Sequence, residues 1–402
     1  MNRAFVSLKY PNYRLWFVGQ LVSLVGTWMQ NTAQAYLGFE LTKSPAFLGY
    51  VAFAYGVPTW VFMLFAGALV DRVSRRKVLI VTQIVMMILA LIMAGLTYLK
   101  WLEPWHILVL SGLLGVANSF DAPARQAIAS ELVDRKDLTN ALALNGALFN
   151  LGSTLGPAIA GITYAVYGPV WCFFFNGLSF IAVLIALFKM KLTNTSQPVI
   201  HAPLVMQLRE GLKYVAGHRV IGVLIFLAAA VSLFGISTVT IFPAWAVHEL
   251  AGDARVAGYL QAGRGVGAVI GAFGVAYFAA TMIRGRIIML GSIILPITLI
   301  GFALIKWLPM SLLFVAIMGF SHIMIMNISN SLIHSEVEDR LRGRVSSIFS
   351  LTFFGLMPLG GLMMGVMAER LSETTAVLTA SFAFVACTVA IFLTQKHLRH
   401  LK

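Results

Sequence analysis

Long apolar segments alternate with short charged segments along the whole chain. Each apolar segment holds roughly 20 residues, which is the length that an α-helix needs to cross ~30 Å of hydrocarbon. The pattern predicts twelve membrane-spanning helices, at residues 15–39, 47–70, 78–99, 105–122, 141–165, 170–189, 220–243, 256–280, 287–305, 310–333, 346–368 and 374–394. We therefore expect an all-α membrane protein.

Composition supports this interpretation and excludes a single soluble core. Hydrophobic residues make up 59% of the chain and charged residues only 11%, whereas a soluble domain carries about 25% charged residues. The net charge of +14 would indicate nucleic-acid binding in a soluble protein. Here the basic residues stand in short clusters between apolar segments, as membrane topology requires, and we predict no nucleic-acid partner.

The distribution of lysine and arginine predicts the orientation in the membrane. If the N-terminus is cytoplasmic, all but six of the 29 basic residues fall in segments on the cytoplasmic side. The six exceptions are Lys43, Lys100, Arg255, Arg264, Lys306 and Arg370. By the positive-inside rule, both termini then face the cytoplasm of a multi-pass protein of the cell inner membrane.

Short sequence matches indicate that the chain consists of two similar halves. The matched pairs are Ser130-Glu131 with Ser335-Glu336, Asp134-Arg135 with Asp339-Arg340, Leu8-Lys9-Tyr10 with Leu212-Lys213-Tyr214, and Gly49-Tyr50 with Gly258-Tyr259. We expect one six-helix bundle at 1–189, a cytoplasmic linker at 190–218 and a second six-helix bundle at 219–402. A stripe of apolar residues from Leu204 to Val215 fits either a helix at the membrane surface or a flexible linker.

Two motifs resemble a known family. The turn after the second span, Gly67-Ala-Leu-Val-Asp71-Arg72-Val-Ser-Arg75-Arg76, resembles the G-x-x-x-D-R-x-x-R-R signature of the major facilitator superfamily. The segment Phe120-Asp121-Ala122-Pro123-Ala124, followed by Leu132-Val133, resembles the branch that contains bacterial drug and enterobactin-type siderophore exporters. The resemblance implies the major facilitator fold, with two pseudo-symmetric bundles and transport by alternating access.

The same resemblance implies gating roles for particular residues. In the family, the aspartate and arginines of the signature close the cytoplasmic side, and these correspond to Asp71, Arg72, Arg75 and Arg76. The alternative is that the basic residues only determine topology. The fifth span carries Gly152, Gly156 and Pro157 in a pattern similar to the family's antiporter motif, with alanine replacing glycine at two places.

Small residues four apart create flat helix faces that allow close packing. We expect the glycines of the fifth span to meet Gly263, Gly267 and Gly271 of the eighth span between the two halves, with ordinary packing inside one half as the alternative. Antiporters of the family often carry an arginine in the fourth span, but Leu110 occupies its spacing before Gly115. Proton antiport by that route is therefore in doubt.

The resemblance implies that the first, fourth, seventh and tenth spans line a central cavity. Unpaired amides cost several kcal/mol in hydrocarbon, so polar residues in these spans must face water, substrate or one another. The candidate substrate-binding residues are Gln30, Asn31, Gln34, Asn118, Gln261, Arg264, His322 and Asn327. Helix-to-helix hydrogen bonding is the alternative for each of them.

Arg264 is the basic residue that the predicted spans place well inside the membrane, where charged groups are rare and functional by default. It is expected to hold an anionic group of the substrate or a carboxylate of the protein. The alternative is that its side chain reaches the periplasmic surface. Asp121 and His322 are the candidates for ion coupling, and each also fits a purely structural role.

The sequence contains no nucleotide-binding P-loop, no H-E-x-x-H and no Cys/His metal spacing, so we predict no cofactor, no metal and no enzyme activity. We predict a monomeric secondary transporter in the lipid bilayer that exports a small amphipathic molecule, such as a drug, siderophore or metabolite. An inward transporter of the same fold is the first alternative. A polytopic membrane enzyme would need clustered catalytic acids or histidines at one membrane face, and a channel would need a charged ring.

Overall fold

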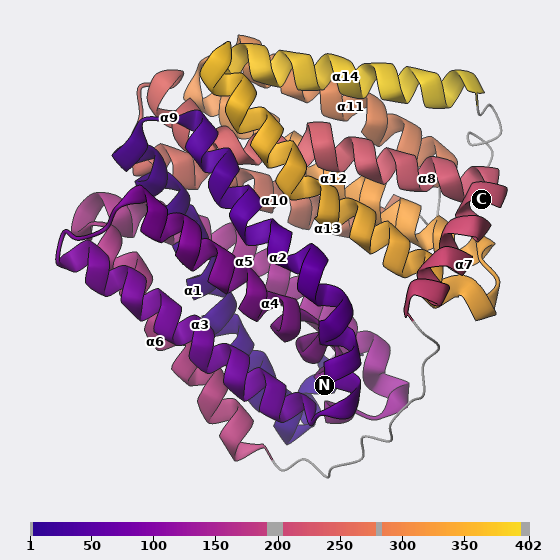
Figure 1. The fold of residues 1–402 in the computed structure, drawn as a ribbon. Coiled ribbons are helices and arrows are strands. Elements are labelled where there is room, and N and C mark those ends of the chain that lie inside the picture. Colours follow the sequence, from indigo (N-terminus) through magenta and orange to yellow (C-terminus); the bar gives the residue numbers. More distant parts are fainter. Residues whose placement is uncertain (1–2, 191–203, 279–283, 395–402) are drawn as a thin grey trace. The chain divides into compact units, whose positions relative to one another are not determined.

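The computed structural model describes residues 3–190, 204–278 and 284–394 (Figure 1). Side chains at 3–4, 63–64, 67–72, 204–208, 276–278, 339 and 394 lie outside the described set. The described segments are helices joined by short turns and contain no strand.

The helices follow one another closely in both halves of the chain. The first half contains η1 (Arg3–Lys9), α1 (Pro11–Thr42), α2 (Pro45–Arg72), α3 (Arg75–Tyr98), α4 (Pro104–Leu132), η2 (Arg135–Asp137), α5 (Leu138–Tyr167) and α6 (Pro169–Lys189). The second half contains α7 (Leu204–Gly217), α8 (Arg219–Ala230), η3 (Val231–Gly235), η4 (Ile236–Ile241), α9 (Phe242–His248), α10 (Ala254–Phe278), α11 (Arg284–Leu304), α12 (Leu308–Glu336), α13 (Asp339–Arg370) and α14 (Glu373–Thr394).

The described residues contain twelve long helical segments at the predicted positions, when α8, η3, η4 and α9 are counted as one continuous segment, Arg219–His248. Within the described residues, nine of the twelve are long and apolar enough to cross a membrane. The other three are α1, α5 and α10. These three are long, but they carry many amides and glycines, which lowers their hydropathy without shortening them.

The chain divides into two compact units that do not coincide with the two halves. One unit comprises Met1–Lys43, Ala54–Ile200 and Gly252–Ala262. The other comprises Ser44–Phe53, His201–Ala251 and Gly263–Lys402. The start of α2 therefore belongs to the second unit, and the start of α10 to the first.

The helices pair in the same order in both units. In the first unit α1 packs against α5 and α6, and α3 packs against α4 and α6. In the second unit the segment from α8 to η4 packs against α13 and α14, and α11 packs against α12 and α14. The counterpart of each spanning segment is the sixth such segment further along the chain. This repetition is the pseudo-symmetry expected of the predicted fold.

The glycines of α5 and α10 produce close helix packing, but against different partners from those expected. A Cβ atom added to Gly156 would lie 2.5 Å from the Cβ of Trp28 in α1, and one added to Gly152 would lie 3.2 Å from Cδ1 of the same tryptophan. In α10, Gly263, Gly267 and Gly271 all face α12. Gly152 and Gly156 therefore do not meet Gly263, Gly267 and Gly271 as the sequence led us to expect.

The two helices do meet at one end, so the expected contact between the two halves of the chain is present there, and by packing both ends belong to the first unit. A Cβ atom added to Gly258 of α10 would lie 2.5 Å from the carbonyl oxygen of Pro157 in α5. A small residue permits a close crossing with any neighbouring helix and does not select the neighbour. Ordinary packing inside one unit thus explains Gly152, Gly156 and the glycine face of α10.

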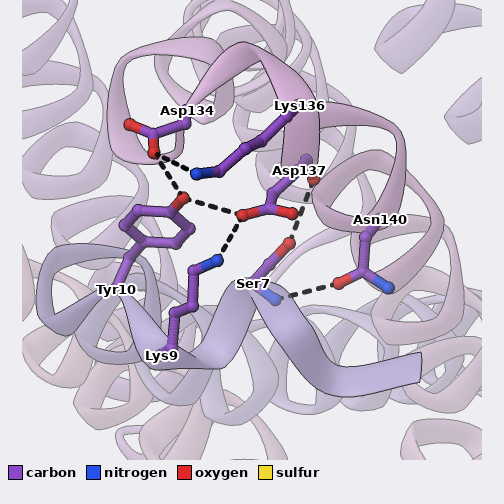
Figure 2. Close-up of polar contacts among 7 residues, drawn as sticks. All are labelled: Ser7, Lys9, Tyr10, Asp134, Lys136, Asp137 and Asn140. Carbon is purple, nitrogen blue, oxygen red and sulfur yellow. Dashed lines mark hydrogen bonds and ion pairs between the residues drawn. The ribbon is translucent and has the colours of Figure 1, made fainter. Parts of the chain in front are cut away.

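A polar cluster fastens η1 to the turn between α4 and α5 (Figure 2). The Lys9 ammonium donates a hydrogen bond to the Asp137 carboxylate at 2.6 Å, and the Tyr10 hydroxyl lies 2.7 Å from the same oxygen. The Ser7 backbone N–H donates to Oδ1 of Asn140 at 3.0 Å. The hydrogen bonds from Lys9 and Tyr10 lower the pKa of Asp137, and the bond to Asp137 raises the pKa of Lys9.

Candidate functional site

A small polar cavity lies inside the first unit, between α1, α2, α3, α4 and α6. Its volume is about 20 Å³, enough for a single water molecule. It is lined by Thr27, Gln30, Asn31, Tyr55, Met86, Leu114, Asn118, Asn176 and Phe180. Three of the predicted binding residues, Gln30, Asn31 and Asn118, are thus brought together around one space.

Close packing of α1 on α6 positions one wall of this cavity. A Cβ atom added to Gly26 would lie 2.5 Å from Oγ of Ser179 and 2.7 Å from Oδ1 of Asn176, so a larger residue could not stand there. One turn further along α1, Gln30 accepts a hydrogen bond from Nδ2 of Asn176 at 2.7 Å. The side-chain oxygen of Gln30 therefore has its partner within the protein.

The other predicted residues of α1 differ in their surroundings. Nε2 of Gln34 donates to Oγ of Ser111 at 2.6 Å, and that hydroxyl donates to the carbonyl of Ile107 at 2.6 Å. This chain of bonds ties α1 to α4, which is the helix-to-helix role left open by the sequence. Asn31 instead has an exposed side chain that lines the cavity.

Asp121 is a buried carboxylate with polar and charged neighbours on α3 and α4. It accepts hydrogen bonds from Oγ1 of Thr82 at 2.9 Å and from Nε2 of Gln83 at 2.8 Å. Its other oxygen lies 3.5 Å from Nη2 of Arg125, one helical turn away. These contacts fasten α4 to α3 and satisfy the charge, so the observed geometry gives Asp121 a structural setting.

The second unit contains a different arrangement at the crossing of α10 and α12. Arg264 is 8% exposed and His322 is 9% exposed. Nε of Arg264 and both ring nitrogens of His322 are buried without a hydrogen-bond partner. The His322 ring stacks on Phe353 of α13, with centroids 5.5 Å apart and planes inclined by 23°. The burial of Arg264 speaks against the alternative in which it reaches the surface.

Two further predicted residues stand apart from this pair. Asn327 has an exposed side chain on α12. Gln261 is partly exposed and belongs to the first unit by its contacts, although it precedes Arg264 by less than one turn of α10. Its Oε1 atom is buried without a partner.

The signature turn between α2 and α3 is only partly described. The side chains of Asp71 and Arg72 lie outside the described residues. Nη1 of Arg75 donates to Oε1 of Glu131 at 2.7 Å and to the carbonyl of Ala127 at 3.3 Å. Nη2 of Arg76 donates to the carbonyl of Phe188 at 3.0 Å. Both arginines thus stabilise the C-terminal ends of neighbouring helices, where a cation is favourable.

Sequence reasoning missed three features of these sites. Two of them are Asn176 and Tyr55, which line the cavity. Asn176 is an amide in the otherwise apolar sixth span, and that was a visible signal in the sequence. The third feature is the π-helical turn η3, which is followed directly by the 3₁₀ segment η4. Such turns occur often at functional sites. Here Oγ of Ser232 in η3 donates to the carbonyl of Phe353 at 2.5 Å.

Comparison with known proteins places these sites in context. A family model described as transmembrane secretion effector matches residues 3–401. The multidrug efflux pump Tap of Mycolicibacterium fortuitum is 26% identical over 353 residues, which cover 85% of this chain and 86% of Tap. The enterobactin exporter EntS of Shigella flexneri is 24% identical over 405 residues, which cover 98% of this chain and 94% of EntS.

Solved structures resemble the whole chain as well. A POT family transporter in complex with a thioalcohol-conjugated peptide has a TM-score of 0.77 at 10% identity, covering 96% of each chain. The nucleoside transporter NupG has a TM-score of 0.75 at 12% identity, covering 96% of this chain and 99% of NupG. At these identities the likeness shows the fold alone, and it confirms the fold that the sequence predicts.

Proposed function

This chain belongs to the transmembrane secretion effector family of the major facilitator superfamily, and from that premise we propose that it exports a small amphipathic molecule across the cell inner membrane. The relatives named above are transporters, so the chain is a membrane transporter of small molecules and not an enzyme. The names of Tap and EntS describe efflux and export, which supports the outward direction.

The observation that carries the proposal is the amide-lined cavity inside an otherwise apolar helix bundle. Polar groups in hydrocarbon are costly. Gln30 and Asn176 bond to each other, and we infer that a ligand uses the other amides around this space. A volume of about 20 Å³ is too small for an organic substrate. The surrounding helices must therefore separate before a substrate enters, as alternating access requires.

Several finer features belong to the same proposal. Both termini lie in the cytoplasm, a proposal that the bias of lysine and arginine supports. The protein works as a monomer. The segments 1–189 and 219–402 act as two bundles joined by a cytoplasmic linker at 190–218. Asp71, Arg72, Arg75 and Arg76 close the cytoplasmic side, and Gly152, Gly156 and Pro157 keep α1 and α5 in close contact while the bundle moves.

Solute flux in proteoliposomes tests the proposal. Purified protein is reconstituted, a proton or sodium gradient is imposed in either direction, and a panel of macrolides, siderophores and cationic dyes is followed. We expect gradient-dependent flux of at least one solute, in the sense that corresponds to export. The Gln30→Leu variant should lose most of that flux because it removes a cavity amide.

The control is Gln126→Leu, which alters an exposed glutamine of the same unit and should leave flux unchanged. Flux in the inward direction alone would show that the protein imports its solute, and the export proposal would be wrong. No gradient-dependent flux of any solute in the panel would contradict the proposal.

A further inference from the structure

The two units contain the same helix crossing, built from different side chains. In the first unit, Gly115 of α4 lies against the backbone carbonyl of Tyr55 in α2. In the second, Gly319 of α12 lies against the backbone carbonyl of Arg264 in α10. Each glycine permits contact so close that a Cβ atom would overlap the facing backbone. The crossing therefore serves as a common reference position, from which residues of the two units can be matched by their sequence distance.

Residues at equal distances from this point correspond to one another. Tyr55 lies five residues after Tyr50, and Arg264 lies five residues after Tyr259, the matching residue of the repeat. Likewise Asn118 follows Gly115 by three residues, as His322 follows Gly319. Tyr55 and Asn118 both line the cavity of the first unit. Arg264 and His322 thus occupy the positions that carry a polar site in the other unit.

From this correspondence and from their unpartnered buried nitrogens, we propose that Arg264 and His322 form an anion-binding subsite for the carboxylate or phosphate of an amphipathic solute. The proposal rests on the transport function proposed above. It assigns a charge to the transported molecule, which the family membership does not specify.

The electrostatic setting supports an anion. A guanidinium keeps its charge at any physiological pH, and a buried cation without a partner is strongly unfavourable. Among the side chains that the structure describes, no carboxylate forms an ion pair with Arg264. A ligand anion would supply the missing charge, and a guanidinium can bind it through two parallel hydrogen bonds.

The surroundings of the pair also suit an amphipathic ligand. Ser329 lies seven residues beyond His322 and so on the same face of α12, and its buried hydroxyl oxygen lacks a partner. The Phe353 ring stacked on His322 offers an apolar wall beside these polar groups. One end of the site thus suits a charged group, and the other suits a hydrocarbon or aromatic body.

Binding of a matched pair of probes tests the subsite. The full-length protein is placed in nanodiscs of phosphatidylcholine, and titration calorimetry compares 2-naphthoate with 2-naphthamide, which has the same ring but no charge. We expect the wild type to bind naphthoate about tenfold to a hundredfold more tightly, as hydrogen bonds to charged groups permit. The Arg264→Ala variant should abolish this preference, Arg264→Lys should keep part of it, and His322→Gln should reduce it.

The control is Arg255→Ala, because Arg255 is exposed and lies 3.7 Å from Asp253, and its loss should leave the preference unchanged. Equal binding of both probes by the wild type, or an unchanged preference in a folded Arg264→Ala or Arg264→Lys protein, would overturn the proposal. Competition between naphthoate and phosphatidylglycerol added to the nanodiscs would assign the site to a lipid headgroup and would also overturn it. If Arg264-dependent naphthoate binding occurs but no solute is transported, the subsite stands and the transport proposal fails.

Discussion

The crossings of α2 with α4 and of α10 with α12 share a backbone arrangement but differ in how their polar groups are satisfied. Around the first crossing, Gln30 is hydrogen-bonded to Asn176, and the polar residues of the cavity are neutral. At the second crossing, Arg264 and His322 carry basic groups with buried, unpartnered nitrogens. The comparison teaches that small residues fix the scaffold, while the flanking side chains remain free to set the chemistry of each unit.

The largest effect is expected from breaking the crossing itself. Gly319→Val would drive a branched side chain into the backbone of α10, and overpacking of this kind costs about 1–3 kcal/mol or more. We expect a marked fall in thermal stability and loss of transport, measured by the melting temperature in detergent and by flux. Gly95→Ala in α3 is the matched control, since an added Cβ there meets open space. Wild-type stability of Gly319→Val would contradict the close contact.

The next effect concerns the chemistry at the second crossing. The double variant Arg264→Tyr with His322→Asn gives α10 and α12 the residues that stand at the first crossing. We expect it to fold, to bind 2-naphthoate and 2-naphthamide equally, and to lose about tenfold or more in naphthoate affinity. Titration calorimetry in nanodiscs measures both affinities. A double variant that still preferred naphthoate would show that charge recognition lies elsewhere.

Part of the fold and of the candidate site could be predicted from the sequence, and part could not. Span lengths, charge bias and the repeat predicted the twelve helices, because each depends on the chain alone. Arg264 and the cavity residues Gln30, Asn31 and Asn118 were found because polar groups in apolar spans are visible in a sequence. The partner of a glycine face was not predictable, since Gly156 and Gly267 permit close approach to any helix. The pairing of Gln30 with Asn176 depends on how α1 and α6 are rotated, which no local pattern reports.

A smaller effect on the melting temperature is expected to separate polar groups that have a hydrogen-bond partner from those that lack one. Asn176→Leu removes the partner of buried Gln30, and such bonds in membranes average about 0.6 kcal/mol. His322→Leu removes a group that has no hydrogen-bond partner to lose. We therefore expect a lower melting temperature for Asn176→Leu and an unchanged or higher one for His322→Leu. The reverse order would contradict the assignment of a satisfied amide pair to Gln30 and Asn176 and of an unpartnered imidazole to His322.

The smallest effect concerns the polar cluster that fastens η1 in the first unit (Figure 2). In the repeat, Lys213-Tyr214 lies in α7, where the Tyr214 ring stacks on His218 at 5.7 Å instead. Because the pKa of Asp137 is lowered, its contribution is present above the unfolded pKa of about 4 and is lost as the pH falls through the folded value. Because the pKa of Lys9 is raised, its contribution is present below about 10.5 and is lost as the pH rises through the folded value.

Hydrogen exchange at the Ser7 amide measures this cluster. We expect Asp137→Asn to speed exchange at pH 7, where the wild type is protected. The difference between the two proteins should shrink as the pH falls through the lowered folded pKa of Asp137. Lys136→Ala is the control, since that exposed lysine lies 3.6 Å from Asp134 and bonds to neither Asp137 nor Ser7. Equal protection of the wild type and Asp137→Asn at pH 7 would remove the ion pair from the fastening of η1.

We propose that the chain transports amphipathic solutes and that the second crossing selects anions among them. The most direct measurement follows the flux of 2-naphthoate and 2-naphthamide in the same proteoliposomes, with the wild type and Arg264→Lys compared under one imposed ion gradient. Gradient-dependent flux that is faster for naphthoate in the wild type, with the difference narrowed in Arg264→Lys and naphthamide flux unchanged, is the expected result. Equal loss of both fluxes in Arg264→Lys, or equal flux of both solutes in the wild type, would contradict it.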